Sequence, residues 1–466
     1  MSPTRKTHVR HSVPVEGGRA ISLLSDAELQ RIAEAVFRAS DADETEVHME
    51  VVADALTRFA NNAIHQNVAE RNLTVSVRTV YGGRTARATT NRTDADSLRQ
   101  VVAASASLAR SRPKNPRLLP MPGPQKYPRV QRFSRGTAET SPAERARAVK
   151  AVCELAAKRG HTAAGIFTTG AMQSAMANSR GLFAAYRQTR AEFSVTMLAA
   201  DSSGWAKANA PDIAAIDPLA LASRATEKAE GSRAPRELAP GRYTVILEPA
   251  AALDLVGFLF YDFAATAVHD QRSCFNHRMG KQVLGRNIFL WDDVTHPLQT
   301  GAPFDGEGLP RQKVLLVDRG VPENLVYSRA AAKEMRRRPT GHGFALPNEY
   351  GEAPMNLVFA GGKSSVEEMI ATTDRGLLIT RLWYIREVEP YEKVLTGMTR
   401  DGTFLVEKGR VAAGIRNLRF NQSVLEMLSK VELLGPGVRA AGEESFEMVV
   451  PAMKVRDFHF TEVTKF

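Results

Sequence analysis

Residues 240–268 read PGRYTVILEPAAALDLVGFLFYDFAATAV, and this stretch decides the fold of the second half of the chain. The β-branched and aromatic run 243–247 predicts a strand. Pro249 then stands where a helix would begin, so we expect an apolar helix over 249–268. As a helix, 250–268 would span about 28 Å, near the thickness of a bilayer core. However, Asp254 and Asp262 would each cost about 2.5–3.5 kcal/mol near the membrane centre. We therefore expect a buried helix of a soluble domain.

The region before this stretch carries the signals of a mixed α/β domain. Ser25 and Glu28 form a capping box, and apolar residues recur at helical spacing, so we expect a helix over 25–38. Apolar and polar residues then alternate over 47–53 and again over 73–77. This period of two predicts half-buried strands.

The next segment contains a hairpin and then a proline-rich connector. Gly82-Gly83 permits a turn into a strand over 85–90, and Thr93 is expected to cap a further helix. Six prolines over 111–128 exclude a helix or a central strand. We expect this segment to run over the surface as an ordered or semi-rigid connector.

A second capping pattern opens the central part of the chain. Ser141-Pro142-Ala143-Glu144 predicts a helix that ends at Gly160. Short strands are expected over 166–169 and 173–177, separated by Gly170.

A composition break over 231–241 marks the expected domain boundary. We predict an α+β fold with a tail over 1–24, an N-terminal domain over 25–235 and a β-rich C-terminal domain over 236–466. Short alternating runs after residue 300 favour a large, mostly antiparallel sheet. These runs lie at 313–318, 325–327, 356–359, 377–384, 402–407 and 448–455.

Composition excludes several classes of protein. The 466 residues are 43% hydrophobic and 24% charged, as in ordinary globular proteins. Two cysteines, Cys153 and Cys274, exclude a disulfide scaffold and a multi-cysteine metal module. The net charge of +11 raises nucleic acid as a partner, but no nucleic-acid-binding signature accompanies it. We interpret the charge mainly as a solvated surface.

The N-terminus, MSPTRKTHVRHSVPVEGG, is basic but has no apolar segment behind it. A secretory signal is therefore not expected. Together with the interpretation of 249–268 as a buried helix, this predicts a cytoplasmic protein without a membrane partner.

A search for catalytic chemistry finds no strong motif. There is no Gly-x-Ser-x-Gly elbow, and no His-Glu-x-x-His or His-Glu-x-x-x-His element among the ten histidines. Cys274 and His277 lie three residues apart, a spacing common by chance. Together with His342, they are the weak candidates for a nucleophilic site formed from distant segments.

Several segments in order resemble the TldD/PmbA family, also called TldD/TldE, from about residue 25 to the end. The segments that carry the resemblance are TRFANN at 57–62, VSVR at 75–78, GGR at 82–84, ATTN at 88–91, NSRGL at 178–182, PGRYTVILEP at 240–249, PFDGEG at 303–308, GGKS at 361–364 and TGMTRDG at 396–402. The resemblance implies a two-domain α+β fold. It also implies a metalloprotease in which a TldD-type chain and a TldE-type chain pair around a cavity that admits unfolded peptides.

In the TldD-type chain, the resemblance implies a zinc site made by His-Glu-x-x-x-His and a C-terminal Cys. The positions that align with the motif's two histidines and glutamate here are Val256, Gly257 and Tyr261, and Ala441 aligns with the cysteine. The helix over 249–268 therefore carries a degenerate metal site. No catalytic residue, metal ligand or cofactor is expected in this chain.

The sequence is thus similar to the partner without zinc. The implied partners are a TldD-like homologue that carries zinc and a peptide substrate, and a homodimer is left open. Whether the chain has peptidase activity alone is also left open. Two other hypotheses are a hydrolase with an unrecognised site, and a nucleic-acid-binding or gyrase-associated protein.

Overall fold

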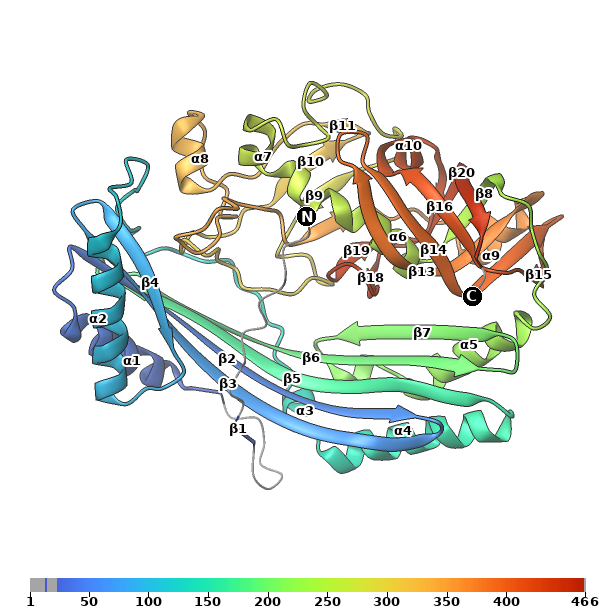
Figure 1. Cartoon of the computed structure of the whole chain (residues 1–466), viewed down its shortest axis with the longest axis horizontal. Coiled ribbons are helices and arrows are strands. Elements are labelled where there is room, and N and C mark those ends of the chain that lie inside the picture. Colours follow the sequence, from blue (N-terminus) through green and yellow to red (C-terminus); the bar gives the residue numbers. More distant parts are fainter. Residues whose placement is uncertain (1–12, 15–22, 465–466) are drawn as a thin grey trace.

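The computed structural model describes residues 13–14 and 23–464 (Figure 1). The expected tail over 1–24, with the N-terminal stretch that argued against a secretory signal, lies almost wholly outside the described residues. The helices are α1 Asp26–Ala39, α2 Ala95–Ser111, α3 Arg135–Ala138, α4 Pro142–Lys158, α5 Pro218–Gly231, α6 Pro249–Val256, α7 Ala265–His269, α8 Arg329–Glu334, α9 Val366–Ala371 and α10 Val424–Ser429, with 3-10 helices η1 Ile213–Ala215 and η2 Gly257–Phe263.

One long antiparallel sheet forms the N-terminal half. Its strands run in the order β1-β3-β2-β5-β6-β7, with β4 paired to β3. Figure 1 shows it as a curved layer, with α1 and α2 at one end and α4 and α5 at the other. The strands are β1 Val13–Pro14, β2 Glu44–Ala60, β3 Ala63–Tyr81, β4 Arg84–Thr90, β5 Thr162–Asn178, β6 Phe183–Leu198 and β7 Ser203–Ala210.

Local sequence signals explain most of this half. The predicted capping boxes at Ser25 and Ser141 are both present, and the glycine hairpin joins β3 to β4. Alternate apolar side chains of the strands pack in two clusters on the sheet, one under α1 and α2 and one under α4 and α5. The segment over 112–128 contains no helix or strand, as its prolines predict.

Two predictions in this half are wrong. The strands expected over 166–169 and 173–177 are one continuous strand, β5. Gly170 does not break it, because a Cβ there would lie 2.2 Å from Oδ1 of Asp54 on β2, so its role is close approach. The residue that caps α2 is Asp94, not Thr93, because the Asp94 carboxylate accepts the Ser97 N–H at 3.0 Å.

The C-terminal half contains two sheets rather than one. The first has the order β11-β10-β9-β12-β19-β18. In the second, β13-β8-β20-β16-β14 close into a ring, because β14 also pairs with β13, while β15 and β17 pair at its edges. The strands are β8 Gly241–Leu247, β9 Leu290–Asp292, β10 Val314–Asp318, β11 Val321–Pro322, β12 Leu357–Phe359, β13 Arg375–Glu389, β14 Val394–Glu407, β15 Arg410–Gly414, β16 Leu418–Ser423, β17 Val431–Leu434, β18 Val438–Ala440, β19 Met448–Val450 and β20 Met453–Val463.

These sheets confirm the predicted α+β class and the mostly antiparallel pairing. Only β12–β19 and β8–β13 pair in parallel among the described strands. Residues 325–327 are not a strand; Val326 forms an isolated bridge with Ala264.

The expected helix over 249–268 is not continuous, and that bridge explains its break at Ala264. The chain forms α6, then the 3-10 helix η2, and then α7 after an extended residue at Ala264. The Ala265 N–H donates to the Val326 carbonyl at 3.0 Å, so tertiary pairing replaces a helical hydrogen bond at this point. α6 and η2 are nevertheless mostly buried, as their apolar sequence predicts, whereas only Ala265 and Ala267 of α7 are buried.

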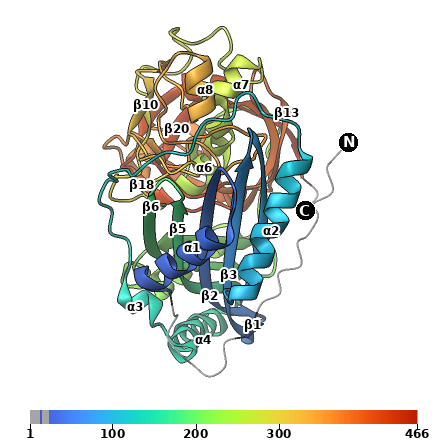
Figure 2. The same ribbon diagram turned by 90° about the vertical axis from the view of Figure 1, so that its left-hand side faces the viewer.

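The two halves stack, with the C-terminal half above the long sheet (Figures 1 and 2). β7, at one edge of that sheet, contacts β14 and β18. The largest apolar core lies in the C-terminal half and includes the buried side chains of α6. No helix among the described residues has both the length and the apolar character needed to cross a membrane.

Candidate functional site

The aligned metal positions lie at the junction of α6 and η2. Pro249 begins α6, and Val256 at its end is fully buried in the C-terminal core. Gly257 follows and is also buried. Tyr261 is half-buried, and its hydroxyl donates to the Tyr350 carbonyl at 3.1 Å.

The segment that begins at Ala441, the position aligned with the family's cysteine, packs against α6. Ala441 is buried, and the residues that follow it turn across the side of α6. A Cβ on Gly442 would lie 2.1 Å from Oδ1 of Asp254, and one on Gly257 would lie 2.1 Å from Oγ of Ser445. Both glycines are therefore needed for the close approach of the two segments.

Asp254 joins the two segments through its carboxylate. It accepts the backbone N–H groups of Glu443, Glu444 and Ser445 at 3.0–3.2 Å. Burial raises the pKa of Asp254 to about 6, although these three hydrogen bonds act in the opposite direction. The sequence did not predict this role, because the partners are about 190 residues away.

Cations from both halves surround the segment after Gly442. The Lys207 ammonium on β7 donates to the Gly442 carbonyl at 2.9 Å and lies 3.3 Å from Glu192 and 3.7 Å from Glu443. Arg381 on β13 pairs with Asp401 and lies 3.7 Å from Glu443. No local pattern in the sequence marked either cation.

A pocket of about 450 Å³ lies next to this cluster, between the long sheet and the C-terminal half. Its polar lining includes Arg190, Glu192, Asn209, Arg439 and Glu447. Arg439 on β18 bonds to Asn209 on β7 and to the Leu298 carbonyl at 3.2 Å. The pocket thus carries both charge signs and amide groups, which suit the backbone and side chains of a peptide.

The side chains at the aligned positions do not fit zinc. Val256, Gly257 and Ala441 have no donor atom, and the Tyr261 hydroxyl is bonded to the Tyr350 carbonyl. A zinc site needs about three protein ligands with N, S or O donors. The one carboxylate that joins the two segments, Asp254, is occupied by three backbone N–H groups. Across residues 13–14 and 23–464, no group of three or more His, Cys, Asp or Glu side chains could hold a metal ion.

The weak nucleophile candidates occupy different environments, and no described contact joins them. Cys274 is buried, and burial raises the pKa of its thiol, which disfavours the reactive thiolate. His277 is exposed and has a φ of 62°. His342 is buried between Asp292 and Thr340, with 2.9 Å on each side, so both ring nitrogens are occupied.

Comparison with known families gives three matches along the chain. Domain 1 of the PmbA/TldA metallopeptidases matches residues 46–109, the central domain matches 137–233, and the C-terminal domain matches 240–462. The last match contains α6 and the segment 441–445.

Curated relatives and solved structures agree with these matches. A metalloprotease TldD homolog of Buchnera aphidicola is 25% identical over 47% of this chain and 44% of its own length, so the chain spans under half of that relative. One from Haemophilus influenzae is 24% identical over 40% of this chain and 41% of its own.

The crystal structure of TldE from Thermococcus kodakarensis shares the fold, with a TM-score of 0.85, 18% identity and coverage of 93% of this chain and 100% of that one. A Thermotoga maritima structure described as a putative modulator of a DNA gyrase has a TM-score of 0.84, 20% identity and coverage of 93% and 100%.

Proposed function

We propose, because the chain belongs to the PmbA/TldD metallopeptidase family, that it is the subunit without zinc in a two-chain protease that acts on unfolded peptides or small proteins. Its partner is a homologue that carries His-Glu-x-x-x-His and binds the zinc. A cytoplasmic location belongs to the same proposal.

One observation carries the proposal. Where α6 and η2 meet the segment after Ala441, this chain has Val256 and Gly257 in place of donor side chains. Asp254 instead ties the two segments together by hydrogen bonds to three backbone N–H groups. The junction is thus stabilised by the chain itself and needs no metal.

The pocket between the halves supports a role in holding substrate. β7 is an edge strand of the long sheet, paired on one side only, with β6. Contacts with β14 and β18 cover part of this edge. We therefore assign peptide binding to the charged and amide groups of the pocket beside β7, which suit hydrogen bonds to a peptide backbone. We assign no chemical step to this chain.

The test compares the purified chain, alone and with a His-Glu-x-x-x-His homologue encoded by the same genome. Zinc per chain and cleavage of a fluorescent unfolded peptide are measured for each sample. We expect neither zinc nor cleavage with the chain alone, and both with the pair. Replacing the motif glutamate of the homologue by glutamine is the matched control and should abolish cleavage while the pair still forms. Stoichiometric zinc and cleavage by the single chain would refute the proposal.

A further inference from the structure

The second sheet of the C-terminal half, in which β13-β8-β20-β16-β14 form a ring, has an outer face on β13 and β14. β7 covers one end of this face. Arg381 on β13 is buried there, with its guanidinium 4.8 Å from the ring of Trp205 on β7. Two residues further along the strand, Trp383 is half-buried, and Val388 is 57% exposed. The opposite face at this level carries buried Leu382 and Leu395 and belongs to the core.

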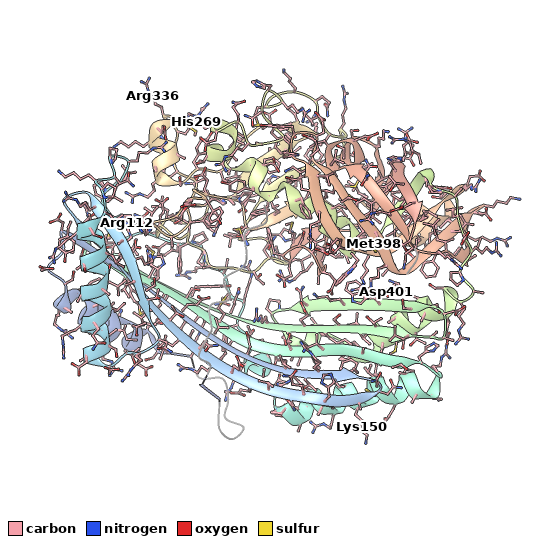
Figure 3. All side chains as sticks on the ribbon, viewed as in Figure 1. Arg112, Lys150, His269, Arg336, Met398 and Asp401 are labelled. Atoms are coloured by element: carbon pink, nitrogen blue, oxygen red, sulfur yellow. The ribbon has the colours of Figure 1, made fainter. Side chains whose placement is uncertain are left out.

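The uncovered part has the composition of a protein interface. Trp383 lies opposite Met398 on β14, which in turn lies opposite Arg419 on β16. Figure 3 labels Met398 on β14, near Asp401 at the junction with β7. Aromatic residues, Met and Arg are the types enriched at interfaces and their hot spots. We call this set the docking face; it consists of Trp383, Tyr384, Arg386, Val388, Met398, Arg400 and Arg419.

The arginines of the docking face retain free hydrogen-bonding capacity. Arg386, Arg400 and Arg419 are 57%, 44% and 36% exposed, and each approaches a carboxylate (Glu444, Asp401 and Glu462, respectively) only at 3.5–3.7 Å. A charge-assisted hydrogen bond is normally about 2.7–2.9 Å long. The guanidinium groups can therefore bind carboxylates supplied from outside.

The charge of the face argues against a second copy of this chain. A two-fold interface sets the same patch against itself, so arginines would meet arginines. The guanidinium groups of Arg400 and Arg381 lie 4.6 Å and 5.8 Å from the centre of the Trp383 ring, so a nucleic-acid base would have to compete with these cations for stacking on it.

We infer that the docking face binds a different protein chain, one that presents carboxylates around an apolar contact. We identify that different chain as the zinc-binding homologue, and this identification rests on the proposed function.

The test uses the full chain and the same homologue, with binding measured by calorimetry. Met398→Glu places an acid at the centre of the face, and the pair Arg386→Glu with Arg400→Glu reverses its charge. The control pair, Arg147→Glu with Lys150→Glu, makes the same charge change on α4, beyond the long sheet (Figure 3). We expect each docking-face variant to weaken binding at least tenfold, the control to bind like wild type, and all melting curves to stay within a few degrees.

Each other result overturns the inference. A complex that the docking-face variants form as tightly as wild type would refute the docking face and leave the proposed function standing. No complex with the wild-type chain would refute the proposed function and this choice of occupant together. A homodimer of the chain alone that Met398→Glu dissociates would assign the face to a second copy. DNA binding lost in the arginine variant would assign it to nucleic acid.

Discussion

Asp254 is the residue that joins α6 to the segment after Ala441. Its carboxylate is buried, yet three backbone N–H groups point at it. Burying a charge is costly, and hydrogen bonds to the charged form offset only part of that cost. The pKa of about 6 is the net result of these opposing effects.

The raised pKa of Asp254 predicts a pH dependence of stability. The folded protein holds this proton with a pKa of about 6 and the unfolded chain with one of about 3.8, so the folded state binds the proton more tightly. The contribution of Asp254 to the free energy of unfolding should therefore rise as pH falls from 7.5 to 5. Asp254→Asn keeps an acceptor oxygen but removes the titration. We expect wild type to gain about 1 kcal/mol more than this variant between pH 7.5 and pH 5.

The measurement is urea denaturation of both proteins at the two pH values. Other buried carboxylates, such as Glu307, titrate in both proteins and cancel in the comparison. Equal pH dependence of the two proteins would contradict the assigned pKa.

At the scale of elements, close approach between helices and strands depends on glycines that local sequence reasoning treats as breaks. Gly204 on β7 is such a residue, because a Cβ there would lie 2.0 Å from the Ala225 carbonyl and 2.5 Å from the Ala229 nitrogen on α5. These atoms belong to the helix backbone and cannot move independently of the helix.

Gly204→Ala should therefore separate α5 from β7 and lower the free energy of unfolding by about 1–3 kcal/mol. Gly123→Ala is the matched control, since a Cβ at Gly123 meets no atom within 4 Å. Thermal melts of both variants check the prediction, and equal melting temperatures would contradict the packing of α5 against β7.

At the scale of the whole molecule, buried polar contacts link the two halves. Asp401 on β14 accepts the Ser203 hydroxyl of β7 at 2.5 Å and pairs with Arg381. Arg381 in turn packs on Trp205. These contacts set the position of β7 beside the docking face and the pocket.

Replacing one partner of the Arg381–Asp401 pair should lower the free energy of unfolding more than replacing both partners. Arg381→Met leaves the charge of buried Asp401 largely uncompensated, because only the more distant Arg400 remains at 3.5 Å. We expect a loss of up to about 3–5 kcal/mol in the free energy of unfolding. Adding Asp401→Asn removes the uncompensated charge, so the double variant should be more stable than Arg381→Met alone. Calorimetric unfolding of the wild type, both single variants and the double variant measures the coupling. Additive losses would show that Arg381 and Asp401 do not stabilise each other.

The sequence by itself determined the local elements and the absence of His, Cys, Asp and Glu at the aligned positions Val256, Gly257, Tyr261 and Ala441. The capping boxes at Ser25 and Ser141 and the glycine hairpin before β4 depend on residues within a few positions of one another. The aliphatic character of Val256 likewise needs no structure to recognise. Such short-range rules act the same way in any fold.

Only the tertiary structure decided how these pieces meet. It separated η2 from α7 because Ala264 pairs with Val326, and it kept β5 whole because Gly170 makes room for Asp54. It also gave Asp254 its three N–H donors and left Trp383 and Met398 on an uncovered face. Each of these contacts joins residues far apart in the chain, and their free energy depends on burial and approach, which local sequence patterns do not encode.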